Sequence, residues 1–418
     1  MSLAATAGLS LDQAPPLHVP GRFFLTAPLA AIAAGVLLLV QGSAALTSPW
    51  APSTIALTHL GTLGFLATIM WGALYQMLPV VGGRPVPALR LAMVAHALHV
   101  LGVVGLEAGL LGVGQRAAQL GLASLSAALL CSMLPVGWAI ATAPAKTTTL
   151  RGMGVALASL GGGATLGVVL GLLYAVGWVQ PARPALLQVH LALGLLGWVG
   201  VLLASVSLTI APMFYLSPPV PDAQARGGLW VAGASMAAAA LSALVGHPLP
   251  LLALPAAVVL WIAHPAALLH SFTLRRRKVR EPSLEFWRVG LATAALVAGL
   301  AFCTELDLHP RLGLLTGWVA IVGWAGVIAH GMLYRIVPFL VWFHRFSPRV
   351  GLEPVPSLRE LLVARRQYVA LGLHCAATTV GAAAIVGAND ALARLAGALL
   401  VAAGLALLLN LAHTLRRA

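Results

Sequence analysis

The feature that most constrains this chain is a series of twelve apolar segments, separated by short polar connections, that covers nearly its whole length. A bilayer crossing needs about 20 apolar residues. Backbone N–H and C=O groups cannot stay unpaired in lipid, so each segment is predicted to be a helix. Only 8% of the residues are charged, whereas soluble domains have about 25%. The sequence therefore predicts an all-α polytopic membrane protein and excludes a water-soluble enzyme. The segments are expected at residues 23–41, 55–79, 88–112, 117–142, 150–178, 184–212, 227–246, 250–272, 286–303, 310–342, 361–387 and 390–414.

The positions of the basic residues predict how the helices are oriented. The net charge is +14, but the Lys and Arg residues stand in short runs between apolar segments, so they indicate orientation in a bilayer and not nucleic-acid binding. With twelve spans, 20 of the 24 Lys and Arg fall on the side of the N-terminus. We therefore expect both termini to be cytoplasmic in a bacterial-type inner membrane. Residues 1–22 are expected to be a tail without a cleavable signal, 23–414 a single twelve-helix domain, and 415–418 a C-terminal tail.

A pattern repeats in the second, sixth and tenth segments. Each begins with a histidine at its outer end, continues with a stripe of small residues and ends with a proline. Small residues at helical spacing let helices, or a flat ligand, approach closely. Because the pattern returns every fourth helix, the sequence predicts three four-helix units related by a pseudo-threefold axis. The histidines are His59, His190 and His309, and the prolines are Pro79, Pro212 and Pro338.

This arrangement resembles the large subunit of the haem-copper oxidase superfamily. The resemblance implies a low-spin b-type haem bound axially by His59 and His309. It also implies that His190 is a ligand of a second metal, such as copper, with His247-Pro248 in place of the histidine pair at the end of helix seven. The resemblance in topology extends over the whole chain, whereas the resemblance in residues is limited to these short stretches. Among shortened relatives, the chain is most similar to NnrS-type haem- and copper-containing proteins linked to the nitric oxide response.

The second metal centre of the family is incomplete in this sequence. Asp307 stands where the family has the histidine ligand of its high-spin haem, and Gly194 stands where it has a tyrosine or glutamate. The resemblance therefore implies one surviving haem site and a partial site for copper. It does not imply an oxygen-reducing centre.

The residue types themselves also favour a bound haem, independently of the resemblance. Imidazole is a good axial ligand for iron, and polar groups inside a membrane are functional by default. No Cys-x-x-Cys-His motif is present, so the haem is expected to be non-covalent. However, His59 lies 20 residues before Pro79, whereas His309 lies 29 before Pro338. At about 1.5 Å per residue, His309 would lie about 14 Å further along its helix from the proline than His59 does. His330 is therefore kept as the alternative partner of His59.

Several other polar residues of the segments have less definite roles. His96 and His99 are spaced to share a helix face, where they would hold a metal or a haem propionate, or simply pack. His374 stays unassigned. Glu107 is the only acidic residue well inside a segment, and Arg335 is expected to reach the lipid headgroups.

Two classes of function stay open. The first is a haem redox protein that passes electrons or handles nitric oxide, either as an oxidoreductase or as a non-catalytic haem subunit. Its electron donor would be a cytochrome c or a small membrane subunit, and copper would lie near His190 and His247. The second is a metal-free transporter or structural subunit that retains the fold, since internal repeats are also common in transporters. The placement of the histidines favours the first class.

Overall fold

The computed structural model describes residues 13–175 and 181–416, with only the backbone given for 174 and 175. The described residues contain twelve helices that are long and apolar enough to cross a membrane, so the predicted all-α polytopic fold is confirmed. Within these ranges the only β-type pairing is one isolated bridge between Val350 and Glu353.

The first six spans run from α2 to α9. They comprise α2 (His18–Gln41) with η2 (Gly42–Leu46); α3 (Pro52–His59), η3 (Leu60–Ala67) and α4 (Thr68–Gly82); α5 (Leu89–Leu110); α6 (Gln115–Thr142); α7 (Thr148–Ala175); and α8 (Arg183–Leu191), η4 (Ala192–Gly200) and α9 (Val201–Tyr215).

The last six spans run from α10 to α17. They comprise α10 (Asp222–Leu244); η5 (Pro250–Ala253), α11 (Leu254–Val258), η6 (Val259–Ala263) and α12 (His264–Thr273); α13 (Pro282–Glu305); α14 (Leu312–Trp318), η7 (Val319–Gly326), α15 (Val327–Val341), η8 (Trp342–Phe346) and η9 (Ser347–Arg349); α16 (Ala364–Gly387); and α17 (Asp390–Arg416).

The helices form two compact units, which we describe separately. Unit 1 comprises the described parts of Met1–Ala14, Met77–Ala88 and Leu129–Lys278. Unit 2 comprises Pro15–Gln76, Leu89–Ala128 and the described part of Val279–Ala418. The first helix begins at His18, inside the tail predicted for residues 1–22, while residues 1–12 lie outside the described part of the chain. The organisation of 23–414 as a single domain stays a prediction.

Spans two, six and ten share a long π-helical segment at the same position. The segments η3, η4 and η7 end at Ala67, Gly200 and Gly326, and each of these residues lies twelve residues before the proline of its span. π-Helical turns inside α-helices are uncommon and are often found at functional sites. The shared position supports the sequence repeat, whereas the grouping into three four-helix units stays a prediction.

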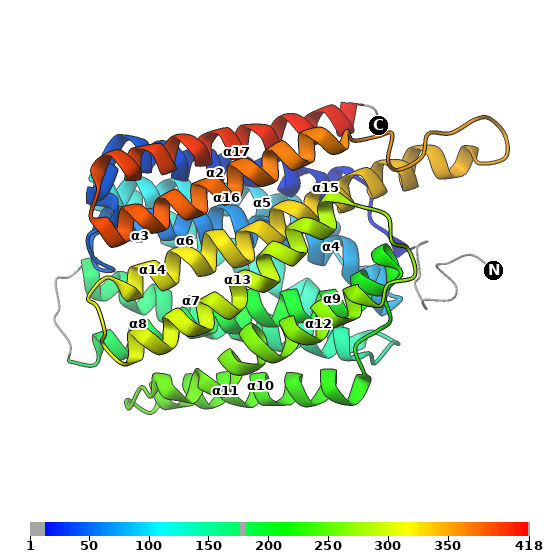
Figure 1. Cartoon of the computed structure of the whole chain (residues 1–418). Coiled ribbons are helices and arrows are strands. Elements are labelled where there is room, and N and C mark those ends of the chain that lie inside the picture. Colours follow the sequence, from blue (N-terminus) through cyan, green and yellow to red (C-terminus); the bar gives the residue numbers. More distant parts are fainter. Residues whose placement is uncertain (1–12, 176–180, 417–418) are drawn as a thin grey trace. The chain divides into compact units, whose positions relative to one another are not determined.

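In unit 2, the packing before the proline is also repeated. Gly72 and Gly331 each lie seven residues before the proline of their span. A Cβ at Gly72 would lie 2.7 Å from the ring of Phe24, on the preceding span, and a Cβ at Gly331 would overlap the side chain of Phe286 on α13. Each glycine therefore makes room for a buried phenylalanine. Along another face of this unit, α17 packs against both α2 and α16 (Figure 1).

In unit 1, small residues also occupy the matching contact. Ser205 lies seven residues before Pro212, and it faces Gly152 of the preceding span α7, where a Cβ would overlap its hydroxyl. Eight residues before Ser205 on the same span, Gly197 of η4 faces Ser159 of α7. The close approach of α7 to the sixth span therefore depends on small side chains on both helices.

Candidate functional site

His59 is held in the tautomer that leaves Nε2 as an acceptor. It is the last residue of α3 and directly precedes η3. Its Nδ1–H donates to the Ile55 carbonyl oxygen over 2.9 Å, so in the neutral ring Nε2 keeps its lone pair. Within the described part of the chain, Nε2 has no hydrogen-bond partner. A ring fixed through one nitrogen and open at the other is the usual state of a histidine that ligates iron.

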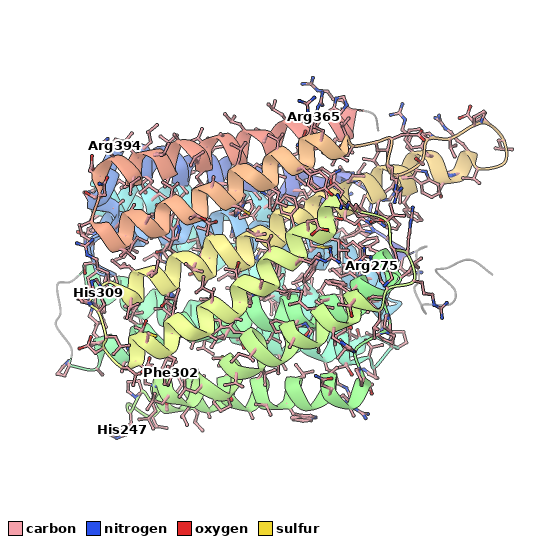
Figure 2. The ribbon with its side chains drawn as sticks, in the orientation of Figure 1. His247, Arg275, Phe302, His309, Arg365 and Arg394 are labelled. Carbon is pink, nitrogen blue, oxygen red and sulfur yellow. The ribbon has the colours of Figure 1, made fainter. Side chains whose placement is uncertain are left out.

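His309, predicted as the second haem ligand, lies outside the helix. It is an exposed residue of the turn between α13 and α14, and α14 begins only at Leu312 (Figure 2). Its Nδ1 accepts a hydrogen bond of 3.2 Å from the Arg311 N–H, and Nε2 has no partner in the described ranges. The residue that directly precedes η7, as His59 precedes η3, is Trp318. The pairing of His59 with His309 stays a prediction.

His330, the alternative ligand, has no nitrogen free for iron. It is 1% exposed in the interior of unit 2. Its Nδ1 lies 3.0 Å from Nδ1 of His374, and its Nε2 lies 3.1 Å from the Tyr334 hydroxyl. Binding iron would break one of these hydrogen bonds in a buried place, which is costly. The haem proposal below therefore uses His59 and His309 and not His330.

Two histidines that the sequence left without a definite role bind the π-helical segments. His99 Nε2–H donates to Leu63 O over 3.0 Å, and His374 Nε2–H donates to Val322 O over 3.0 Å. Both carbonyls lie sixteen residues before the proline of their span. Both carbonyls also have another donor: Val322 O accepts from the Val327 N–H, and Leu63 O accepts from the Thr68 hydroxyl. Each histidine therefore adds a hydrogen bond from the span that follows to a backbone carbonyl of a π-helical segment.

A signal for this pair was present in the sequence. His99 and His374 both stand on the helix directly after a helix with the repeated pattern. His96, which was expected to share a role with His99, has its own partners: its Nε2 lies 2.9 Å from the Thr26 hydroxyl, and its ring packs edge-on against Phe23. The two histidines of α5 therefore serve different contacts.

Glu107 is an unusual buried acid on α5. Its side chain is 7% exposed, and neither carboxyl oxygen has a hydrogen-bond partner in the described ranges. It lies one turn beyond Val103, which packs near Gly64 of η3. Since α5 also packs against α3, Glu107 lies on the part of α5 that passes the end of the second span. Glu107 stands three residues before the end of α5, and a buried carboxyl group without a partner in the described ranges is costly, which makes it a candidate functional residue.

The predicted copper ligands belong to unit 1. His190 on α8 hydrogen-bonds through Nδ1 to Gly163 O of α7 over 2.8 Å. His247 is exposed in the turn between α10 and η5 (Figure 2). The ends of the helices that carry them are close, because α8 packs against both α10 and η5. No group of three His, Cys, Asp or Glu side chains suited to a metal occurs in the described ranges, and copper stays a prediction.

Comparison with known proteins gives no relationship to add to this geometry. The chain matches no protein-family model and no curated protein. What the arrangement offers chemically therefore follows from its own residues. In the described ranges these are His59 and His309, whose Nε2 atoms have no hydrogen-bond partner, the buried carboxyl group of Glu107, also without a partner, and the buried pair of His330 and His374.

Proposed function

We propose that the protein is a haem-binding membrane protein of a bacterial-type inner membrane, with both termini cytoplasmic, that takes part in electron transfer or nitric oxide handling. The observation that carries the proposal is the state of His59. The Ile55 carbonyl fixes its ring, and Nε2 has a lone pair without a partner in the described ranges. Bound b-type haem would supply an iron centre that passes electrons or binds a diatomic ligand.

The helix that follows His59 packs closely against the tenth span. Gly61, two residues further, has no Cβ, and one added there would lie 2.8 Å from the side chain of Ile321. This glycine therefore lets the π segments η3 and η7 pack together directly beside His59. In this proposal His59 and His309 would hold the haem iron through Nε2, and the Ile55 carbonyl orients the His59 ring.

The test is the visible spectrum of the purified protein, oxidised and reduced with dithionite. We expect a Soret band in the wild type. In His59→Ala we expect the Soret absorbance per chain to fall by about tenfold or more, because the substitution removes a ligand of the iron. His270→Ala is the matched control, because His270 is exposed at the end of α12. His309→Ala is expected to change a six-coordinate low-spin spectrum to a high-spin one. Absence of a Soret band after expression with ample haem, or an unchanged His59→Ala spectrum, would contradict the proposal.

For the partial site of unit 1, we propose that His190 and His247 bind copper. Two imidazoles are a small ligand set, since copper sites usually have three or more protein ligands, so a water molecule or another side chain must complete it. We expect elemental analysis to find about one copper per chain in metal-replete protein. This copper should be lost in His190→Ala and in His247→Ala while the haem spectrum persists. Copper that survives both substitutions would show that it binds elsewhere.

Glu107 favours a second candidate function, a transporter that retains the fold without metals. Intramembrane carboxyl groups are typical of proton- and cation-coupled pathways, and this one has no partner in the described ranges. The same spectrum separates the two candidates, because a metal-free transporter has no Soret band.

A further inference from the structure

The interior of unit 2 contains a chain of polar side chains from three different spans. Asn410 of α17 donates through Nδ2 to the Tyr334 hydroxyl oxygen over 3.1 Å, and this hydroxyl lies 3.1 Å from Nε2 of His330 on the same helix, α15. His330 Nδ1 then lies 3.0 Å from Nδ1 of His374 on α16. The chain ends where His374 Nε2–H donates to the backbone carbonyl of Val322 in η7, over 3.0 Å.

The partners determine where each hydrogen lies in the neutral chain. A carbonyl only accepts, so His374 carries its hydrogen on Nε2 and its Nδ1 is an acceptor. His330 must therefore donate from Nδ1, which leaves its Nε2 as an acceptor for the Tyr334 O–H. The Tyr334 oxygen in turn accepts from the Asn410 amide. Every buried polar atom of the two rings is satisfied, and all the hydrogen bonds point from Asn410 towards Val322.

We propose that this chain is a binding site for one proton, which it holds as an imidazolium shared by His330 and His374 across their Nδ1–H···Nδ1 bond. The proton, taken from the water outside, adds to Nε2 of His330, which then donates to the Tyr334 oxygen. The Tyr334 O–H must turn to a new acceptor. Rotation of the Asn410 amide by half a turn brings its Oδ1 to the place of Nδ2, where it accepts from Tyr334 at the same 3.1 Å. The charged chain is again fully hydrogen-bonded.

The geometry allows one proton and opposes a second. His330 Nδ1–H already uses the single acceptor of His374, and His374 Nε2–H is bound to Val322 O. Adding a proton to Nδ1 of His374 would place two N–H groups and two positive charges face to face at 3.0 Å. Such repulsion between like charges strongly separates the two protonation steps of a coupled pair. The inference does not depend on the binding of haem.

Within the described ranges, no carboxylate hydrogen-bonds to either ring of the pair. From α13 the ring of Phe286 covers His330, with 5.0 Å between centroids. The ionisable residues next to it, Glu285 and Arg288, pair with each other. On α15, Arg335 pairs with Glu281, and α17 faces the chain with Asn410, which does not titrate. Stabilisation of the charge therefore depends on the hydrogen bonds of Tyr334 and His374.

Solid-state NMR of the full chain in lipid bilayers, with histidine rings labelled in ¹⁵N, tests this directly. Correlation across the Nδ1–H···Nδ1 bond identifies His330 and His374 without any substitution. On acidification from about pH 9 to about pH 4, we expect one ring of the pair to become an imidazolium while the other stays neutral. Both rings neutral throughout, or both rings charged, would overturn the proposal.

Matched tyrosine variants provide a second test of the proton-binding site. Tyr334→Phe removes the acceptor for Nε2–H of the charged form, so we expect the proton affinity of the pair to fall by about tenfold or more, the usual effect of losing a charge-assisted hydrogen bond. Asn410→Leu should act in the same direction, because the reoriented Tyr334 hydroxyl then lacks an acceptor. Tyr368→Phe is the control, since Tyr368 is 40% exposed on α16. A Tyr334→Phe titration that coincides with the wild type would rule out the proposed site.

Discussion

Replacing Gly397 with leucine is expected to separate α17 from α2 and to leave little folded protein. A Cβ at Gly397 would lie 2.5 Å from Leu39 N and 2.7 Å from Gly35 O, both backbone atoms of the opposite helix. A Cβ at Gly35 would meet Gly397 O at 2.7 Å in the same way. A backbone cannot rotate away as a side chain can, so the helices must move apart. In a bilayer, where helices associate through close packing, this contact has no substitute.

We expect the loss in the free energy of unfolding to exceed about 4 kcal/mol, which is more than most single substitutions cause. The measurement is thermal unfolding in detergent combined with size-exclusion chromatography. The matched control is Gly372→Leu on α16, because nothing lies within 4 Å of a Cβ added there. Gly397→Leu protein that is monodisperse and unfolds at the same temperature as Gly372→Leu protein would contradict the expectation.

The helices could be predicted from the sequence because lipid imposes a local requirement. Each crossing needs a continuous apolar run that satisfies its own backbone, so the twelve spans follow from composition alone. The start of the first helix could not be predicted in the same way. The apolar run begins near residue 23, but α2 begins at His18, directly after Pro15, Pro16 and Leu17. Proline is compatible with the start of a helix, so the helix extends beyond its apolar part.

The alignment of the repeat decides which residues are compared at the candidate site. His59 stands directly before a π segment, a feature that the sequence pattern did not predict. His309 was chosen because the residues after it resemble those after His59, although its longer distance to the proline argued against this alignment. The π segments align Trp318 with His59 instead. The partners of His330 are His374 on α16 and Tyr334 on its own helix, and the contact of Tyr334 with Asn410 on α17 could not be predicted from a single sequence.

Arg335 is another residue whose partner is fixed by tertiary structure. The sequence predicted that it reaches the lipid headgroups, but its Nη1 lies 3.3 Å from Oε2 of Glu281, and its side chain is only 18% exposed. Oε1 of the same glutamate lies 3.4 Å from Nη2 of Arg359. Glu281 is 11% exposed and directly precedes α13. One carboxylate therefore joins the end of α15 and the segment before α16 to the start of α13.

Glu281→Gln is expected to destabilise the protein by about 3 to 5 kcal/mol, because it leaves the mostly buried charge of Arg335 without its carboxylate. The matched control is Glu285→Gln, one turn further along α13. That carboxylate pairs with Arg288 at 2.9 Å, but both side chains are about a third exposed, and such pairs contribute about 1 kcal/mol or less. Unfolding in denaturant compares the two. The double variant Glu281→Gln with Arg335→Gln should recover part of the loss, since the uncompensated charge is then removed as well. Equal effects of the two glutamine substitutions would mean that the headgroups or water compensate Arg335 and that the ion pair does not hold this end of α13.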